Sequence, residues 1–189
     1  MFPLAPMTLE SPTNVAGFSA PAAGFEAPFE LLQACHEKVL RMSDLLERLV
    51  AHVETHGADA SARSAAADVL RYFDLAAPKH HEDEERHVFP ALLAQGDLRQ
   101  CEGVARLQAE HQLFERDWAR LRTILQVWRD AAATPAAVHD VRPLVAGFVE
   151  MNRRHVELEE TLTYPAARSL FDADELARMG AEMQARRRE

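Results

Sequence analysis

The sequence predicts an all-α protein whose main part is an up-down-up-down four-helix bundle. Apolar residues recur at alternating steps of three and four over four long stretches, which is the period of an amphipathic α-helix. No stretch shows the apolar–polar alternation of a β-strand, and only 7 of the 189 residues are glycine. Four such helices with short connections pack most simply as antiparallel neighbours.

The predicted elements follow one another in a simple order. Residues 1–25 contain several prolines and a single charged side chain and show no period, so an irregular or disordered leader is expected. The bundle is expected over residues 26–170. Its four helices are predicted over residues 28–56, 60–94, 98–131 and 135–170, and Pro78 is expected to kink the second. Residues 171–189 are predicted to form a short C-terminal helix, capped by Asp172 and ending in solvated arginines.

Charge and cysteine content exclude several classes of function. Lys and Arg total 21 against 30 Asp and Glu, a net charge of −9, which disfavours a nucleic-acid partner. Two cysteines cannot form a disulfide framework, and no apolar run approaches the roughly 18 residues that cross a membrane. The N-terminus also lacks the basic segment of a signal peptide. We therefore expect a cytoplasmic protein without a membrane partner, and the sequence indicates no protein partner.

Six polar residues occupy positions of the apolar seam that should face the bundle core. They are His36, His80, Glu84, His111, His155 and Glu159. Each glutamate follows a histidine by four residues, so the two side chains lie on one helix face and can point at one centre. Buried polar groups are costly when they are left unpaired, and bound metal would compensate for that cost.

The same six residues form an internal repeat. One constant offset in residue number relates His36 to His111, His80 to His155, and Glu84 to Glu159. The same offset relates Phe73 to Phe148, Glu82 to Glu157, Glu85 to Glu160, Phe89 to Tyr164, and Pro90 to Pro165. The sequence therefore predicts two copies of one helical hairpin, each supplying a histidine and a His-x-x-x-Glu pair.

Four imidazoles and two carboxylates suit a pair of metal ions. A structural zinc site closes at four ligands, so six would overfill it. Two histidines on each ion, with both glutamates bridging, leave room for a bridging oxo or hydroxo group and a small exogenous ligand. Histidine and carboxylate without thiolate favour iron, with manganese or zinc as substitutes. Two iron ions are therefore the expected cofactor.

Three further residues are alternatives or additions to this set. His81 with Glu85 repeats the His-x-x-x-Glu spacing in another register, although the seam through His81 is less apolar. His87 lies one turn beyond Glu84 in the same seam, as an extra ligand, a supporting hydrogen-bond donor or a packed histidine. Glu115 is either a third carboxylate ligand or a salt-bridging residue at the rim.

The motifs HHEDEERHVFP at 80–90 and HVELEE at 155–160 resemble those of hemerythrin-like proteins with the HHE cation-binding domain. The resemblance covers roughly residues 28–170 and implies a bundle with a non-haem diiron centre at the six residues above. The set of four His and two Glu is similar to that of the branch that repairs iron-sulfur centres. Members of that branch often carry a cysteine-bearing N-terminal domain, and the leader here has no cysteine. Oxygen-carrying hemerythrins use histidine at the position of Glu115 and an aspartate on the fourth helix, so the resemblance does not favour simple O₂ transport.

Two classes of function fit these residues and the resemblance. The first is a protein that binds or senses a small ligand (O₂, NO or H₂O₂) at the bundle core. The second is a diiron enzyme (a peroxidase, oxidase or NO reductase) or a protein that repairs iron-sulfur centres. A third interpretation is structural, with the metals mainly stabilising the bundle.

Overall fold

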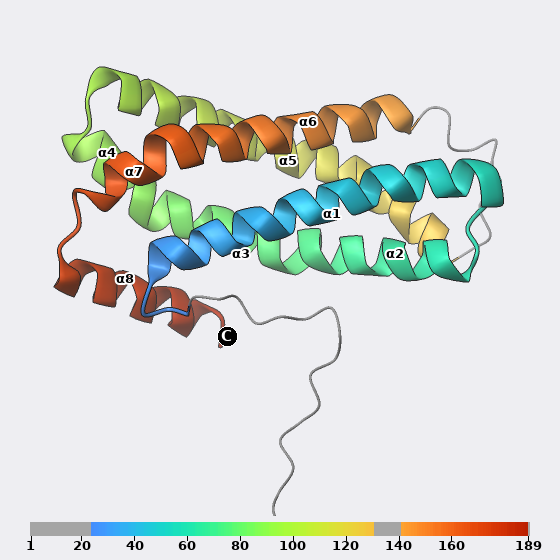
Figure 1. Ribbon diagram of the computed structural model, residues 1–189, viewed down its shortest axis with the longest axis horizontal. Coiled ribbons are helices and arrows are strands. Elements are labelled where there is room, and N and C mark those ends of the chain that lie inside the picture. The colour runs from blue at the N-terminus through green and yellow to red at the C-terminus, as the bar shows by residue number, and fades with distance from the viewer. Residues whose placement is uncertain (1–23, 131–140, 189) are drawn as a thin grey trace, which may run out of the picture.

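The computed structural model describes residues 24–130 and 141–188, and within them four long helical rods lie side by side (Figure 1). The rods begin with α1 (Pro28–His56), α2 (Ala60–Arg71), α5 (Leu98–Asp130) and α6 (Arg142–Leu158). Both α1 and α5 pack against α2 and α6. The described residues contain no strand, so the all-α prediction is confirmed. The up-and-down order of the helices stays a prediction, and the leader and the expected helix start at Pro135 lie outside the described residues.

Two of the rods contain π-helical turns. The second rod continues from α2 through η1 (Tyr72–Ala76), α3 (Ala77–Asp83), η2 (Glu84–Val88) and α4 (Phe89–Gln95). The fourth rod continues from α6 through η4 (Glu159–Thr163) into α7 (Tyr164–Arg168). The segments η2 and η4 are related by the offset that relates Glu84 to Glu159, so the repeat of the sequence extends to the backbone.

Each of these three π segments ends two residues before a proline: Pro78, Pro90 or Pro165. A proline has no N–H to donate, and its ring collides with the carbonyl group four residues earlier. A wider turn relieves that collision, and π turns in helices commonly lie at functional sites. The structure therefore places a π turn where the sequence predicts a kink at Pro78, and adds two π turns that were not expected.

The predicted C-terminal helix is α8 (Ala173–Arg186), which lies at the end of the bundle where α1 begins (Figure 1). Asp172 caps it as expected: its carboxylate accepts from the backbone N–H of Glu175, whose carboxylate accepts from the backbone N–H of Asp172. A Cβ atom on Gly180 would lie 1.8 Å from the carbonyl oxygen of Phe25. Glycine at this position therefore lets α8 approach the chain just before α1.

The arginines at the end of α8 are not all solvated, contrary to expectation. Arg186 is only 9% exposed, and its guanidinium donates to the fully buried carboxylate of Asp83. Arg187 donates to the same carboxylate, and Lys79 donates to the carbonyl oxygen of Arg186 at 2.8 Å. These contacts attach α8 to the turn that immediately precedes Glu84.

Two apolar clusters fill the bundle on either side of a polar layer. One cluster includes Leu46, Leu70, Leu121 and Phe148, and the other includes Phe29, Leu92, Leu107 and Met183. On the first three rods the candidate ligands fall between the stretches that build the two clusters, and on the fourth rod His155 and Glu159 lie where one stretch gives way to the other. No helix in the described ranges combines the length and the apolar character needed to span a membrane.

Candidate metal centre

The six seam residues lie together in the polar layer, and none is more than 4% exposed. They come from six segments: His36 from α1, His80 from α3, Glu84 from η2, His111 from α5, His155 from α6 and Glu159 from η4. Their ligand-type atoms form two groups of four that share both glutamates. Within each group the atoms lie within 4.8 Å of one another, which suits one metal ion per group.

Glu84 directs one oxygen to each half of the cluster. Its Oε1 lies 3.4 Å from Nε2 of His80 and 4.0 Å from Nε2 of His36. Its Oε2 lies 3.5 Å from Nε2 of His111. One carboxylate therefore faces both histidine pairs, which is the arrangement of a bridging ligand.

Glu159 does the same from the opposite rod. Its Oε2 lies 3.0 Å from Nε2 of His36, and its Oε1 lies 3.1 Å from Nε2 of His155. These short approaches lack hydrogen-bond geometry, because both oxygens of Glu159 and Oε2 of Glu84 have no hydrogen-bond partner in the described part of the chain. A buried carboxylate in that state is costly unless a cation lies against it. The donor set and these unpartnered atoms fit a bound cation.

Three of the four histidines are held by a carboxylate at Nδ1. The pairs are His36 with Glu160 at 2.7 Å, His111 with Glu85 at 2.9 Å, and His155 with Glu110 at 2.9 Å. A carboxylate only accepts, so each Nδ1 donates, and the lone pair of the neutral ring lies at Nε2. Carboxylates in this position are typical of metal-binding histidines.

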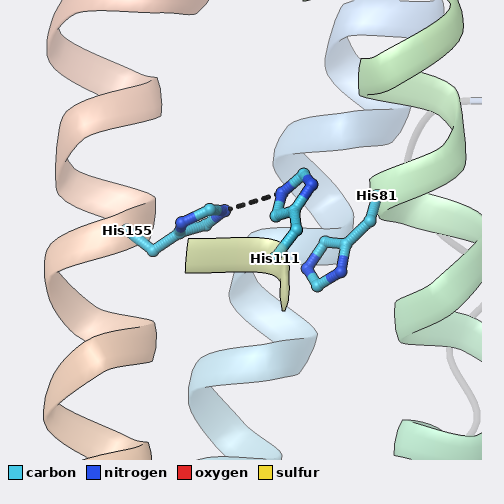
Figure 2. Close-up of side chains that lie close together, drawn as sticks. All are labelled: His81, His111 and His155. Atoms are coloured by element: carbon cyan, nitrogen blue, oxygen red, sulfur yellow. Dashed lines mark hydrogen bonds between the residues drawn. The ribbon is translucent and has the colours of Figure 1, made fainter. Parts of the chain in front are cut away.

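The Nε2 atoms of His111 and His155 lie 3.2 Å apart and point toward one another (Figure 2). With both Nδ1 atoms donating to carboxylates, two neutral rings would direct two lone pairs at each other. A hydrogen bond between them requires one ring to be fully protonated. A cation between the rings would instead accept both lone pairs.

The glutamates favour protonated imidazoles when no metal is bound. Burial lowers the pKa of His155, but the charge of Glu159 outweighs burial and raises that pKa to about 10. Burial also lowers the pKa values of His36 and His111, but the charges of Glu159 and Glu84 and the hydrogen bonds to Glu160 and Glu85 outweigh burial and raise them. Burial lowers the pKa of His80, whose Nδ1 has no hydrogen-bond partner among the described residues. Metal ions must therefore compete with protons for this cluster.

Comparison with known proteins agrees with this geometry. Residues 27–167 match the model of the hemerythrin HHE cation binding domain. The chain belongs to the hemerythrin HHE family. A Haemophilus influenzae protein described as uncharacterized is 33% identical over 165 residues, which cover 87% of this chain and 92% of that protein. Cation binding defines the family, and the histidine–glutamate cluster is the candidate site for it.

In this HHE domain, His80 and His81 both reach the cluster, although the sequence presents them as alternatives. His80 belongs to the group that contains His36, whereas His81 forms a third group with His111 and His155. The His81 ring stacks on that of His111, with ring centroids 4.0 Å apart and 14° between the planes (Figure 2). Adjacent helix residues point about 100° apart, so His80 and His81 can face different halves of the cluster from the same helical turn.

The other two additional candidates of the HHE domain lie apart from the cluster. The Nε2 of His87 lies 2.7 Å from Oε2 of Glu182 on α8. The side chain of Glu115 is exposed and belongs to the lining of a cavity. Neither residue belongs to a group of ligand-type side chains in the described chain.

That cavity, of about 530 Å³, reaches both histidines of the His111 and His155 half, but only His80 of the other half. Its histidine lining consists of His80, His81, His111 and His155. Aromatic rings form its walls: Phe73, Phe114, Trp118 and Phe148. Charged side chains at its exposed edge include Glu82, Glu85, Arg86 and Glu115. A small molecule can therefore approach the His111 and His155 half through an aromatic passage.

Sequence reasoning missed Tyr164, which is 3% exposed. Its hydroxyl donates to Oε1 of Glu84 and lies 3.1 Å from Nε2 of His36. Burial raises the pKa of this phenol well above its ordinary value, and the charge of Glu84 raises it further. The sequence did contain a signal for this residue, because the repeat pairs Tyr164 with Phe89 and so places a hydroxyl in only one of two equivalent positions.

Sequence reasoning also did not predict that carboxylates would accept hydrogen bonds from Nδ1 of the candidate ligands. Glu85 and Glu160 are partners in the repeat, so their shared position could have indicated a shared role. Glu110 gave no such signal, because its counterpart in the first hairpin is Cys35.

Proposed function

We propose that this HHE-domain protein holds two iron ions that share Glu84 and Glu159. The ions are assigned to two histidine pairs: His36 with His80, and His111 with His155. The observation that carries this proposal is that each buried glutamate faces both pairs with separate oxygens. Manganese or zinc can occupy the same donors as substitutes.

Iron bound by these donors supplies redox and Lewis-acid chemistry. The side chains around the cluster orient the ligands and limit the access of water. Glu85 and Glu110 accept hydrogen bonds from Nδ1 of His111 and His155, respectively. These bonds keep each Nε2 lone pair directed at the cluster. Phe114 and Phe148 line the approach and limit the entry of bulk water.

The proposed ligand is a small molecule, O₂, NO or H₂O₂, that binds at the His111 and His155 half. The cavity supports this choice of half, because its lining includes both of these histidines, whereas it includes His80 but not His36 of the other pair. Binding or sensing of such a ligand is the function that this geometry supports best.

Catalytic turnover is a second candidate, and Glu85 favours it. This carboxylate is 44% exposed, lines the cavity and accepts from Nδ1 of His111. It therefore joins a candidate ligand to solvent and can relay protons, which reduction of peroxide, O₂ or NO consumes. A peroxidase, an oxidase, an NO reductase and a protein that repairs iron-sulfur centres all fall in this class.

We assign the function to the bundle of residues 26–170, because all six candidate ligands lie within it. A cytoplasmic location belongs to the same proposal. The two cysteines, Cys35 and Cys101, are free thiols, which suits a reducing compartment.

Metal analysis after anaerobic iron loading tests this function. We expect about two irons per chain in the wild type and in Glu157→Gln, whose exposed side chain lies two residues from Glu159. Glu159→Gln should lose iron, because it removes a charge that both ions share. Spectra of the reduced protein should change with NO or O₂, and repeated consumption of H₂O₂ would favour the enzyme. A folded chain that takes up no iron would refute the proposal.

A further inference from the structure

The two halves of the cluster differ at one aromatic position. Tyr164 lies beside His36, with ring centroids 5.0 Å apart and 15° between the planes. Its repeat partner, Phe89, lies beside His111, with centroids 5.5 Å apart and 29° between the planes. The same architectural position therefore carries a hydroxyl in one half and none in the other.

The backbone places both rings in the same way. The N–H of Tyr164 donates to the carbonyl oxygen of Glu159, and the N–H of Phe89 donates to that of Glu84, each across a π turn. Each aromatic residue is thus fixed by the backbone of a shared glutamate. Because phenylalanine fills this position in one half, packing alone does not require the hydroxyl of Tyr164.

That hydroxyl lies among the candidate ligand atoms of its half. It is 3.1 Å from Nε2 of His36 and donates to Oε1 of Glu84. Ligands at neighbouring positions of one ion, each about 2.1 Å from it, lie roughly 3 Å apart. The phenol oxygen therefore stands where another ligand of the same ion would stand.

We propose that the phenol oxygen of Tyr164 is a further ligand of the ion assigned to His36 and His80. The inference rests on the proposed function. As the oxygen–metal bond forms, the O–H bond breaks and the proton passes to solvent, and no oxidation state changes. Among the six seam residues and Tyr164, the ion at His36 and His80 then has five protein ligands. The ion at His111 and His155 has four. The small ligand is directed to the His111 and His155 half, both of whose histidines line the cavity.

The chain offers a matched control, because it contains two tyrosines. Tyr72 is also buried, but its hydroxyl donates to the carbonyl oxygen of Cys35 at 3.3 Å. The full chain is loaded with iron, oxidised with ferricyanide and examined by visible absorption and resonance Raman spectroscopy. We expect a phenolate-to-iron(III) band in the wild type and in Tyr72→Phe, and its loss in Tyr164→Phe with two irons retained.

The outcomes separate this inference from the proposed function. Two irons per chain without a phenolate band would overturn the inference and leave the function standing. A band that Tyr72→Phe removes would also overturn it. If Tyr164→Phe fails to fold, a band retained in Tyr72→Phe still assigns the phenolate to Tyr164, the remaining tyrosine. A chain that binds no iron would overturn both proposals.

Discussion

Cys35 and Glu110 occupy equivalent positions in the two hairpins, but only Glu110 supports a candidate ligand. Its carboxylate accepts from Nδ1 of His155 at 2.9 Å, whereas Nδ1 of His80 has no hydrogen-bond partner in the described chain. Burial raises the pKa of the Cys35 thiol to about 11, so it stays uncharged at neutral pH and does not replace a carboxylate. The halves thus share their ligands but differ in what supports them.

Glu110→Ala is expected to weaken metal binding by about 10- to 100-fold, because losing such a support frees the ring and lowers its basicity. Competition with a chelator measures the change. Glu102→Ala removes an exposed glutamate from the same helix and should leave the affinity unchanged. Equal affinities in the two variants would show that the contact with His155 does not support metal binding.

The metal-free protein is expected to lose stability as the pH rises from about 6.5 toward about 10. The pKa of His155 is about 10 in the folded chain, against 6.5 for an ordinary histidine. Its protonation therefore stabilises the fold fully below the lower value, and this stabilisation is lost as the pH passes the higher one. His36 and His111 contribute with the same sign, because their pKa values are also raised.

Thermal unfolding of loaded and metal-free protein across this pH range provides the measurement. Metal at Nε2 removes the titration, so the melting temperature of the loaded protein should change less. Groups elsewhere titrate in both forms, and their effect cancels in the difference. Identical pH profiles would mean that bound metal does not replace these protons.

Asp83→Ala should lower the free energy of unfolding by about 3 kcal/mol, because it leaves a buried guanidinium without its main partner. The loss should be no larger, since Glu182 still accepts from Arg186 at 2.7 Å. Asp44→Ala breaks an exposed pair with Arg153 and should have little effect. Urea unfolding of both variants measures the difference, and an equal response would rule out a stabilising buried pair.

Gly180→Ala should loosen the docking of α8. The new Cβ would lie 1.8 Å from the carbonyl oxygen of Phe25, a backbone atom that cannot rotate away. Gly147→Ala is the matched change, because a Cβ there meets nothing within 4 Å, and it should stabilise α6 by roughly 0.5–1 kcal/mol. Hydrogen exchange of the α8 amides should accelerate only in Gly180→Ala. Unchanged protection would show that α8 tolerates a wider spacing.

The sequence allowed prediction of the all-α class and of six residues that the structure brings together, for two physical reasons. Burial along long helices leaves an apolar period, and polar residues such as Glu84 and Glu159 stand out against it. The constant offset between the two hairpins then links them without any knowledge of packing.

The π turns explain much of what could not be predicted. A seam drawn at 3.6 residues per turn assumes an unbroken α-helix, whereas each π turn shifts the following residues around the axis. His87 lies within η2 and faces Glu182, although the straight seam directs it to the core. Glu85 and Glu160 could not be recognised from periodicity, because partly exposed carboxylates resemble ordinary surface charges. The docking of Arg186 depends on a tertiary contact that has no local pattern.

The central claim is that two ions share Glu84 and Glu159. Anomalous diffraction at the iron absorption edge, from crystals of the iron-loaded protein, tests it most directly. We expect two peaks, one beside each histidine pair, with both glutamates in contact with both ions. A single peak in the cluster, or iron bound only elsewhere on the chain, would contradict the claim.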